Sequence, residues 1–321
     1  MITCNTDTFY GVGVNPVIAV FTAHEPHDPA KLCKFIDFRD DGYEVRAHIG
    51  LVEGNSAKDK RQHLLDVWRG KVEAPSKFCV TSTVTAEDEW LHSVYYFNDE
   101  IPSDADFEKA IGDYLTFEFS MVMQNREYLF ANLQHVSELG APLAIPKLTE
   151  KEWRPIRLSD IGIISSGRDI YELERIPGNI PYITSGSQNN GIGYFVGNKN
   201  STIDADYIAF NRNGAVGKAF YHPYESLMGN DCRKLHLKNH NDGLYTGLFI
   251  ATVISMQSVC FSYSRKLGTE RAKKLRIMLP MNGSGAPDYA YMEQYVKNLL
   301  RKKYRQYLDF LEAQRKVDTI R

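Results

Sequence analysis

The sequence has few cysteines and no long apolar run. Its five cysteines never stand in a Cys-x-x-Cys pair, and its nine histidines are scattered, so neither residue type predicts a metal site. No segment reaches the roughly eighteen consecutive apolar residues that a membrane span needs. The first residues have neither the basic nor the apolar region of a secretion signal. We therefore expect a cytoplasmic protein with reduced cysteines, no membrane contact and no metal.

The sequence also lacks the usual catalytic signatures. It contains no phosphate-binding Gly-x-x-x-x-Gly-Lys-Ser/Thr motif, and the pair of glycines at Gly11 and Gly13 lacks the third glycine of a dinucleotide site. No Gly-x-Ser-x-Gly elbow occurs. The acidic run Glu87–Glu89 is more typical of a solvated surface than of a nuclease centre. We expect no catalytic and no cofactor-binding residue, and no catalysis by this chain alone.

Charge is distributed unevenly between the two halves of the chain. Residues 1–150 carry 13 Lys and Arg against 24 Asp and Glu, whereas residues 151–321 carry 25 against 16. The net charges are thus -11 and +9. A basic half next to an acidic one indicates that the second half faces a polyanion. Chance segregation of charge between two domains is the alternative.

A length of 321 residues suits two domains, each with its own core. The segment 140–146, with one glycine and two prolines, marks the boundary between them. We predict a mixed α/β (α+β) fold, with an α/β segment over 1–140. Its expected elements are a buried strand at 17–21, a hairpin formed by 35–39 and 43–46, and helices at 56–68 and 104–119.

The second half is predicted to be strand-rich over 150–286. Short apolar segments alternate there with Gly, Asn, Ser and Pro, which predicts strands at 180–183, 193–196, 207–210 and 219–221. The segment 244–261 is apolar and long enough for a buried helix. Over 287–321 the apolar residues recur at helical spacing, which predicts a long helix of roughly 40 Å. Its apolar face requires a second helix, in cis or from a partner chain.

Signals of nucleic-acid contact gather in this second half. The segment 265–276 holds six basic residues against one acidic residue, beside a glycine and a threonine, as phosphate contacts require. The segments 184–191 and 211–214 offer Arg, Asn and Gln, which pair with base edges. An ordinary polar turn is the alternative for any one of them. The candidate DNA-binding residues are Ser185, Ser187, Gln188, Asn189, Asn211, Arg212, Asn213, Arg265, Lys266, Thr269, Arg271, Lys273 and Lys274.

Four segments in this half, in order, resemble the target recognition domain of type I restriction-modification specificity subunits. They are Trp153–Gly167, Ile180–Ser185, Asn211–Gly217 and Lys274–Pro280, the last of which resembles the strand before the family's long spacer helix. The resemblance implies a recognition domain over 150–286 and a spacer or dimerisation helix over 287–321.

The first half resembles the C-terminal end of an adenine-N6 DNA methyltransferase, the modification subunit of such systems. The segments concerned are 9–21, 35–43 and 87–91. That family's Asn/Asp-Pro-Pro-Tyr/Phe motif, which holds the flipped adenine, is absent here, as is its glycine loop. The resemblance therefore implies that S-adenosylmethionine binds a partner methyltransferase and not this chain.

Together these resemblances imply a DNA-binding specificity protein that directs a methyltransferase or endonuclease to its target. Its expected partners are double-stranded DNA, a methyltransferase subunit, and a second copy bound through the C-terminal helix, with a restriction subunit as a further candidate. One alternative is a part of a fused methyltransferase and restriction enzyme that is active only in complex. Another is an interaction or scaffold protein that does not bind DNA.

Overall fold

The computed structural model describes all residues except 10, 13, 132–139, 239–242, 262–265 and 321. For residues 310–320 it describes the backbone only. It forms two compact units. Unit 1 comprises Met1–Asn98 and Val259–Arg265, and unit 2 comprises Asp99–Ser258 and Lys266–Arg321. The mixed α/β class expected from the sequence is confirmed, because both units combine strands with helices.

Unit 1 is built on a sheet with the order β2-β1-β3-β6. Strand β1 pairs antiparallel with β2 and parallel with β3, and β6 closes the other edge. Phe35 and Ile36 of β3 are buried at its centre. The bounds of the unit 1 elements are β1 Ile2–Cys4, β2 Val17–Ile18, β3 Cys33–Phe38, β4 Tyr43–Arg46, β5 Gly50–Glu53, α1 Ala57–Trp68, β6 Cys79–Ser82 and α2 His92–Tyr95.

Two expectations for unit 1 were wrong. Strand β3 does not form a hairpin with β4, because β4 pairs instead with β5, which follows it closely. The expected buried strand at 17–21 is a two-residue edge strand, and its side chains are exposed. An apolar run therefore reaches the surface here, since β2 has a neighbour on one side only.

Unit 2 contains a sheet with the order β12-β11-β14-β8, a second with the order β10-β9-β13, and the pair β15-β7. Strands 9 to 12 lie where the sequence predicts them, within one or two residues. The bounds are β7 Trp153–Arg157, α5 Leu158–Ile161, β8 Gly162–Ser166, β9 Ile180–Ile183, β10 Ile192–Val196, β11 Tyr207–Asn211, β12 Ala219–His222, β13 Leu227–Met228, β14 Cys232–Leu237 and β15 Arg276–Pro280.

The apolar helix α6 (Leu244–Met256) supplies the core of unit 2. Eleven consecutive residues from Leu244 to Ile254 are buried, because α6 packs against β11, β12 and α8 at once. A Cβ at Gly247 would lie 2.1 Å from a ring carbon of Tyr221. Only glycine allows α6 to approach β12 this closely.

Helix α3 (Asp104–Met123) also belongs to unit 2. It begins with a capping box between Ser103 and Asp106. The Phe107 ring lies 4.5 Å from that of Phe249 in α6 and 5.0 Å from that of Tyr295 in α8. The boundary between the two compact units therefore lies between Asn98 and Asp99, whereas the sequence composition indicated a domain boundary near 140–146.

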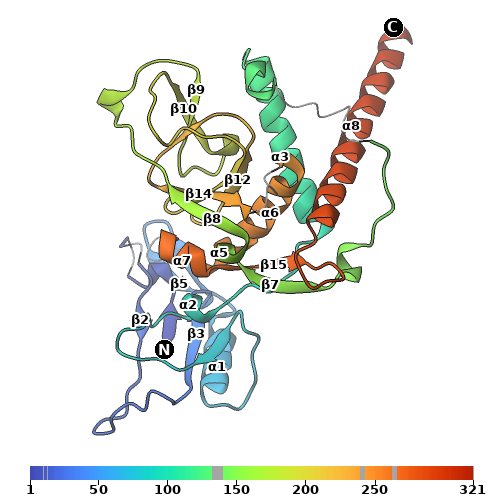
Figure 1. Ribbon diagram of the computed structural model, residues 1–321. Coiled ribbons are helices and arrows are strands. Elements are labelled where there is room, and N and C mark those ends of the chain that lie inside the picture. Colours follow the sequence, from blue (N-terminus) through green and yellow to red (C-terminus); the bar gives the residue numbers. More distant parts are fainter. Residues whose placement is uncertain (10, 13, 132–139, 239–242, 262–265, 321) are drawn as a thin grey trace. The chain divides into compact units, whose positions relative to one another are not determined.

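Helix α8 (Tyr289–Ile320) is the predicted C-terminal helix, with 32 residues and a length of about 48 Å. Met292, Val296 and Leu300 are buried against unit 2, whereas Tyr307 and Leu308 are 51% and 58% exposed. Its last turns extend beyond the strands (Figure 1). In the described part of the chain, no helix is long and apolar enough to cross a membrane.

Candidate nucleic-acid interface

The segment 184–191, which we call the recognition loop, connects β9 to β10. Its ends are joined by the backbone bond from Thr184 N to Gly191 O, at 2.8 Å, and the loop turns back where Asn189 and Asn190 adopt left-handed φ angles of 54° and 49°. Asparagine tolerates this conformation better than most residues. The side chains of Ser187, Gln188 and Asn189 are exposed. The tip of the loop thus presents polar groups to solvent.

Asn190 anchors this tip from inside the domain. Its side chain is buried, and Nδ2 donates to Tyr221 O at 3.0 Å and to the Tyr224 hydroxyl oxygen at 3.1 Å. His222 Nδ1 lies 3.4 Å from the same nitrogen, and burial lowers the pKa of His222 to about 3. The neutral imidazole can therefore accept a hydrogen bond at neutral pH. The sequence analysis missed Asn190, although two successive asparagines before a glycine signal a left-handed turn.

The turn 211–217 between β11 and β12 lies against the recognition loop. Ala215 N donates to Ser185 O at 3.1 Å, and Asn211 Nδ2 donates to Gly186 O at 2.8 Å. Gly214 has a φ of 60°, and a Cβ there would lie 2.5 Å from Ser185 O. The two segments selected from the sequence are thus adjacent in space. Asn211 itself is buried, so its amide holds the two loops together and its edge is not open to a base.

Arg212 and Asn213 project from this turn towards Asp231. The Arg212 Nη1 atom lies 3.9 Å from Asp231 Oδ1, and Asn213 Nδ2 donates to that oxygen at 3.4 Å. Both side chains are half-buried. We call the segment 265–276 the basic segment. Its Leu267 N donates to Arg212 O at 3.1 Å, which brings this part of the basic segment to the same turn.

The basic segment includes helix α7 (Thr269–Lys274). Thr269 Oγ1 accepts a hydrogen bond of 2.7 Å from Arg233 Nε, and Arg271 Nη1 donates to Lys266 O at 2.9 Å. Lys273 forms an ion pair with Glu270, and Lys274 is exposed. Arg265 lies outside the described residues.

Arg233 is a further residue that sequence reasoning missed. It is 6% exposed and, besides Thr269, its Nη1 donates to the carbonyl oxygens of Asn230 and Cys232, both at 2.7 Å. Burial, and then the charge of Arg212, lower the pKa of Arg233. The strand Cys232–Leu237 also contains Lys234 and His236, so the sequence gives no sign that Arg233 is the cation tied to the basic segment. Arg233 ties β14 to the basic segment.

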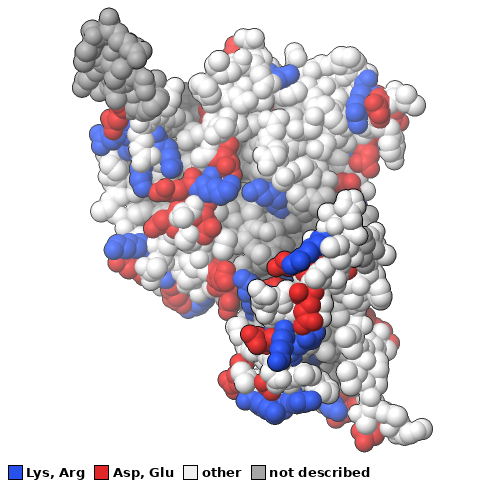
Figure 2. Space-filling model, turned by 180° about the vertical axis from the view of Figure 1, so that it is seen from behind, with Lys and Arg blue, Asp and Glu red and all other residues white. Residues whose placement is uncertain are grey.

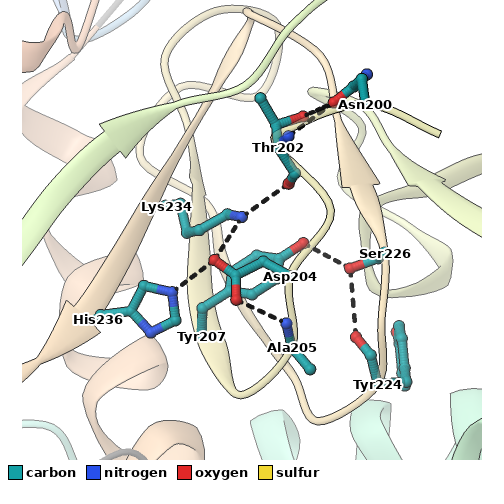
Figure 3. A network of polar contacts seen from close by, with 9 residues as sticks. All are labelled: Asn200, Thr202, Asp204, Ala205, Tyr207, Tyr224, Ser226, Lys234 and His236. Carbon is teal, nitrogen blue, oxygen red and sulfur yellow. Dashed lines mark hydrogen bonds and ion pairs between the residues drawn. The ribbon is translucent and has the colours of Figure 1, made fainter.

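A polar network beside β14 involves Asp204, Lys234 and His236 (Figure 3). Asp204 Oδ2 lies 2.8 Å from Lys234 Nζ and 2.9 Å from His236 Nε2. Burial raises the pKa of Asp204, but the hydrogen bonds from Lys234 and His236 outweigh it and leave the pKa below its usual value. Tyr207 bonds to Ser226 at 2.6 Å nearby. These contacts fix the position of β11, from which the turn 211–217 continues, and of β14, which contains Arg233.

Basic residues do not form a continuous field on the face shown in Figure 2, where Lys and Arg alternate with Asp and Glu and leave wide uncharged areas.

Residues 150–307 match the model of the type I restriction modification DNA specificity domain. This part of the chain is similar to that family. The resemblance inferred from four short motifs is thereby confirmed for the second half, and the match extends into α8.

Two curated relatives come from Heyndrickxia coagulans. The type II restriction enzyme and methyltransferase RM.BcgI is 47% identical over 134 residues, 42% of this chain and 21% of that protein. The specificity subunit S.BcgI of a type II restriction enzyme is 34% identical over 197 residues, 61% of this chain and 56% of that subunit. The chain thus spans about a fifth and about half of the curated relatives it matches.

Solved structures give weaker likenesses. The type I restriction-modification S subunit from M. genitalium is 20% identical with a TM-score of 0.37, covering 67% of this chain and 56% of that one. The HsdS subunit from Thermoanaerobacter tengcongensis is 13% identical with a TM-score of 0.35, covering 65% and 51%.

Proposed function

We propose that this chain is the DNA-recognition component of a restriction-modification system. It binds double-stranded DNA and directs a methyltransferase or endonuclease to its target. The observation that carries the proposal is the meeting of three segments, the recognition loop, the turn 211–217 and the basic segment, within a domain of the DNA specificity family.

Within this interface the side chains divide into two roles. Ser187, Gln188 and Asn189 at the loop tip, with Arg212 and Asn213, offer the donors and acceptors that discriminate base edges. The cationic side chains of the basic segment bind phosphates and set the register on the duplex. These side chains are Arg265, Lys266, Arg271, Lys273 and Lys274. Ser185 and Thr269 add short polar contacts.

A methyltransferase is the partner that the proposal requires. The chain contains no methyltransferase motif, and the identity to RM.BcgI supports a segment derived from such an enzyme. S-adenosylmethionine then binds the partner, in the cytoplasm, and this chain alone transfers no methyl group. The exposed Tyr307 and Leu308 of α8 support contact with a second helix, from a second copy of the chain.

The identity to RM.BcgI also favours a second candidate function. That protein is named both a restriction enzyme and a methyltransferase, so this chain would act as part of a fused enzyme that is active only in complex. Methyl transfer from S-adenosylmethionine to duplex DNA by the purified chain alone would contradict both candidates, because each leaves the chain without this activity outside a complex.

The main test is DNA selection with the full chain. Duplexes enriched from a random pool are expected to share one sequence, to bind more tightly than scrambled duplexes, and to lose affinity steeply as salt rises from about 50 to about 200 mM. A folded sample that enriches no sequence, or whose binding is insensitive to salt, contradicts the proposal.

A further inference from the structure

A groove of about 620 Å³ lies in unit 2 beside the recognition loop. Residues 187–190 of that loop form one wall and α3 forms another. Residues of β12 and α6 complete the lining, among them the small residues Ala251, Thr252 and Ser255. The volume is within the range of ligand pockets, about 300–1,000 Å³. Helix α3 precedes the segment 150–307 that matches the specificity family, so one wall lies outside that domain.

Two lysines line the groove, Lys109 from α3 and Lys218, which immediately precedes β12. Lys109 forms an ion pair with Asp113 at 2.7 Å. Lys218 is half-buried and its ammonium lies 5.6 Å from the centre of the Phe220 ring, and among the described residues no carboxylate forms an ion pair with it. Burial, and then the charge of Lys109, lower the pKa of Lys218. An anion in the groove would oppose both effects, because a nearby negative charge favours the charged form of the lysine.

Two acidic side chains, Asp106 and Asp113, also line the groove, and each has a partner within α3 or its cap. Asp113 is the partner of Lys109, and Asp106 accepts hydrogen bonds from the backbone and hydroxyl of Ser103 in the cap of α3. Lys218 therefore carries a charge that no ion pair offsets among the described residues, whereas the pair of Lys109 with Asp113 is exposed and weak, so that Lys109 can exchange it for a phosphate. The loop tip, with Gln188 and Asn189, lies on the rim of the same groove.

We propose that this groove binds the sugar-phosphate backbone of one DNA strand next to the recognition loop, with Lys218 and Lys109 as the phosphate contacts. The proposal rests on the proposed function. It adds α3 to the DNA-binding surface, so that DNA contact extends beyond the specificity domain. An acidic peptide of a partner protein is the competing occupant, and the groove's continuity with the loop tip favours DNA.

The test measures DNA binding by the full chain at several salt concentrations, with a labelled duplex enriched by that chain from a random pool. Each phosphate contact contributes about 0.9 to the slope of log K against log salt. Lys218→Ala is expected to reduce the slope by about 0.9, and Lys109→Ala/Lys218→Ala by up to about 1.8. Lys218→Arg keeps the charge and is expected to retain the slope. Lys147→Ala, an exposed lysine that does not line the groove, is the matched control.

A second measurement places the contact on the DNA. Duplexes with single neutral methylphosphonates are scanned, and one such position should weaken binding by the wild type but not by Lys218→Ala. Equal slopes for wild type, Lys218→Ala and the double variant overturn the proposal even when the wild type selects a sequence. If the wild type binds no duplex, both the proposed function and the groove proposal fail. That result differs from equal slopes in a wild type that binds DNA, which contradict the groove proposal alone.

Discussion

The side-chain amide of Asn190 donates to the main-chain carbonyl oxygen of Tyr221 at 3.0 Å, and so joins the recognition loop to the strand β12. Gln188 and Asn189, just before Asn190, carry the exposed groups proposed to read bases. The accuracy of that reading depends on a bond made inside the domain, since a loose loop positions its side chains less well.

Asn190→Ala is therefore expected to lower DNA selectivity. The change leaves Tyr221 O and the Tyr224 hydroxyl with one partner fewer, at a cost of about 1–3 kcal/mol in the free energy of unfolding. We expect the ratio of affinities for selected and scrambled duplexes to fall by about tenfold, because one well-placed base contact contributes about 1–3 kcal/mol. Anisotropy titrations on both duplexes measure the ratio.

Asn198→Ala is the matched control for this prediction. Asn198 also fastens a loop, by donating to Glu174 O at 2.8 Å, but it does not lie in the recognition loop. It should lower the melting temperature without changing the ratio. An equal loss of selectivity in both variants would show that Asn190 acts through general stability alone.

Two glycines beside each other in the interface are expected to respond differently to alanine. At Gly214, with a φ of 60°, the new Cβ would lie 2.5 Å from Ser185 O, so Gly214→Ala strains the backbone and pushes the turn from the loop. We expect a loss of about 1–3 kcal/mol in the free energy of unfolding. At Gly186 the nearest atom to a Cβ is 3.8 Å away, and Gly186→Ala should be tolerated. Urea unfolding of both variants checks this, and equal stability of the two contradicts the predicted contact.

The features that the sequence predicts are those set by residues close together in the chain. Helices α1, α3, α6 and α8 and strands β9 to β12 were predictable, because periodicity and turn residues are local signals. The pairing of β4 with β5 was not, since several apolar segments could serve equally well as partners. The exposure of Val17 and Ile18 was missed for a similar reason: an apolar run does not show whether its strand lies at an edge.

The candidate interface could be selected from the sequence by residue type, but the sequence does not show how each side chain is placed. Asn211 and Gln188 look alike in sequence, yet one is buried and holds two loops while the other is exposed. Arg233 and Asn190 act from the interior, and their partners are distant in the chain. The place of α3 in unit 2 depends on Phe107 meeting Phe249 and Tyr295, a contact across more than a hundred residues.

Glu118 of α3 should make the stability of the protein depend on pH. Burial raises its pKa to about 7, whereas the unfolded carboxyl titrates near 4.5. Its folded form thus binds the proton more tightly, so the contribution of Glu118 to stability is fully present below pH ~4.5 and is lost as pH rises through about 7, by at most about 3 kcal/mol. Glu118→Gln should remove this fall. Thermal melts of both proteins at a series of pH values measure it, with Glu127→Gln as control, and parallel curves contradict the assignment.

Base-reading and phosphate-binding residues should separate in their effects on DNA affinity. Gln188→Ala is expected to relax selection at one base position and cost about 1–3 kcal/mol on the selected duplex only, because it removes a contact to a base edge. Lys274→Ala should weaken binding to selected and scrambled duplexes alike and reduce the salt slope by about 0.9, because a phosphate contact carries no sequence. Titrations of both variants on both duplexes, over a range of salt, separate the two roles. If Gln188→Ala weakens the scrambled duplex equally, or if Lys274→Ala changes the preferred sequence, the division of the interface is wrong.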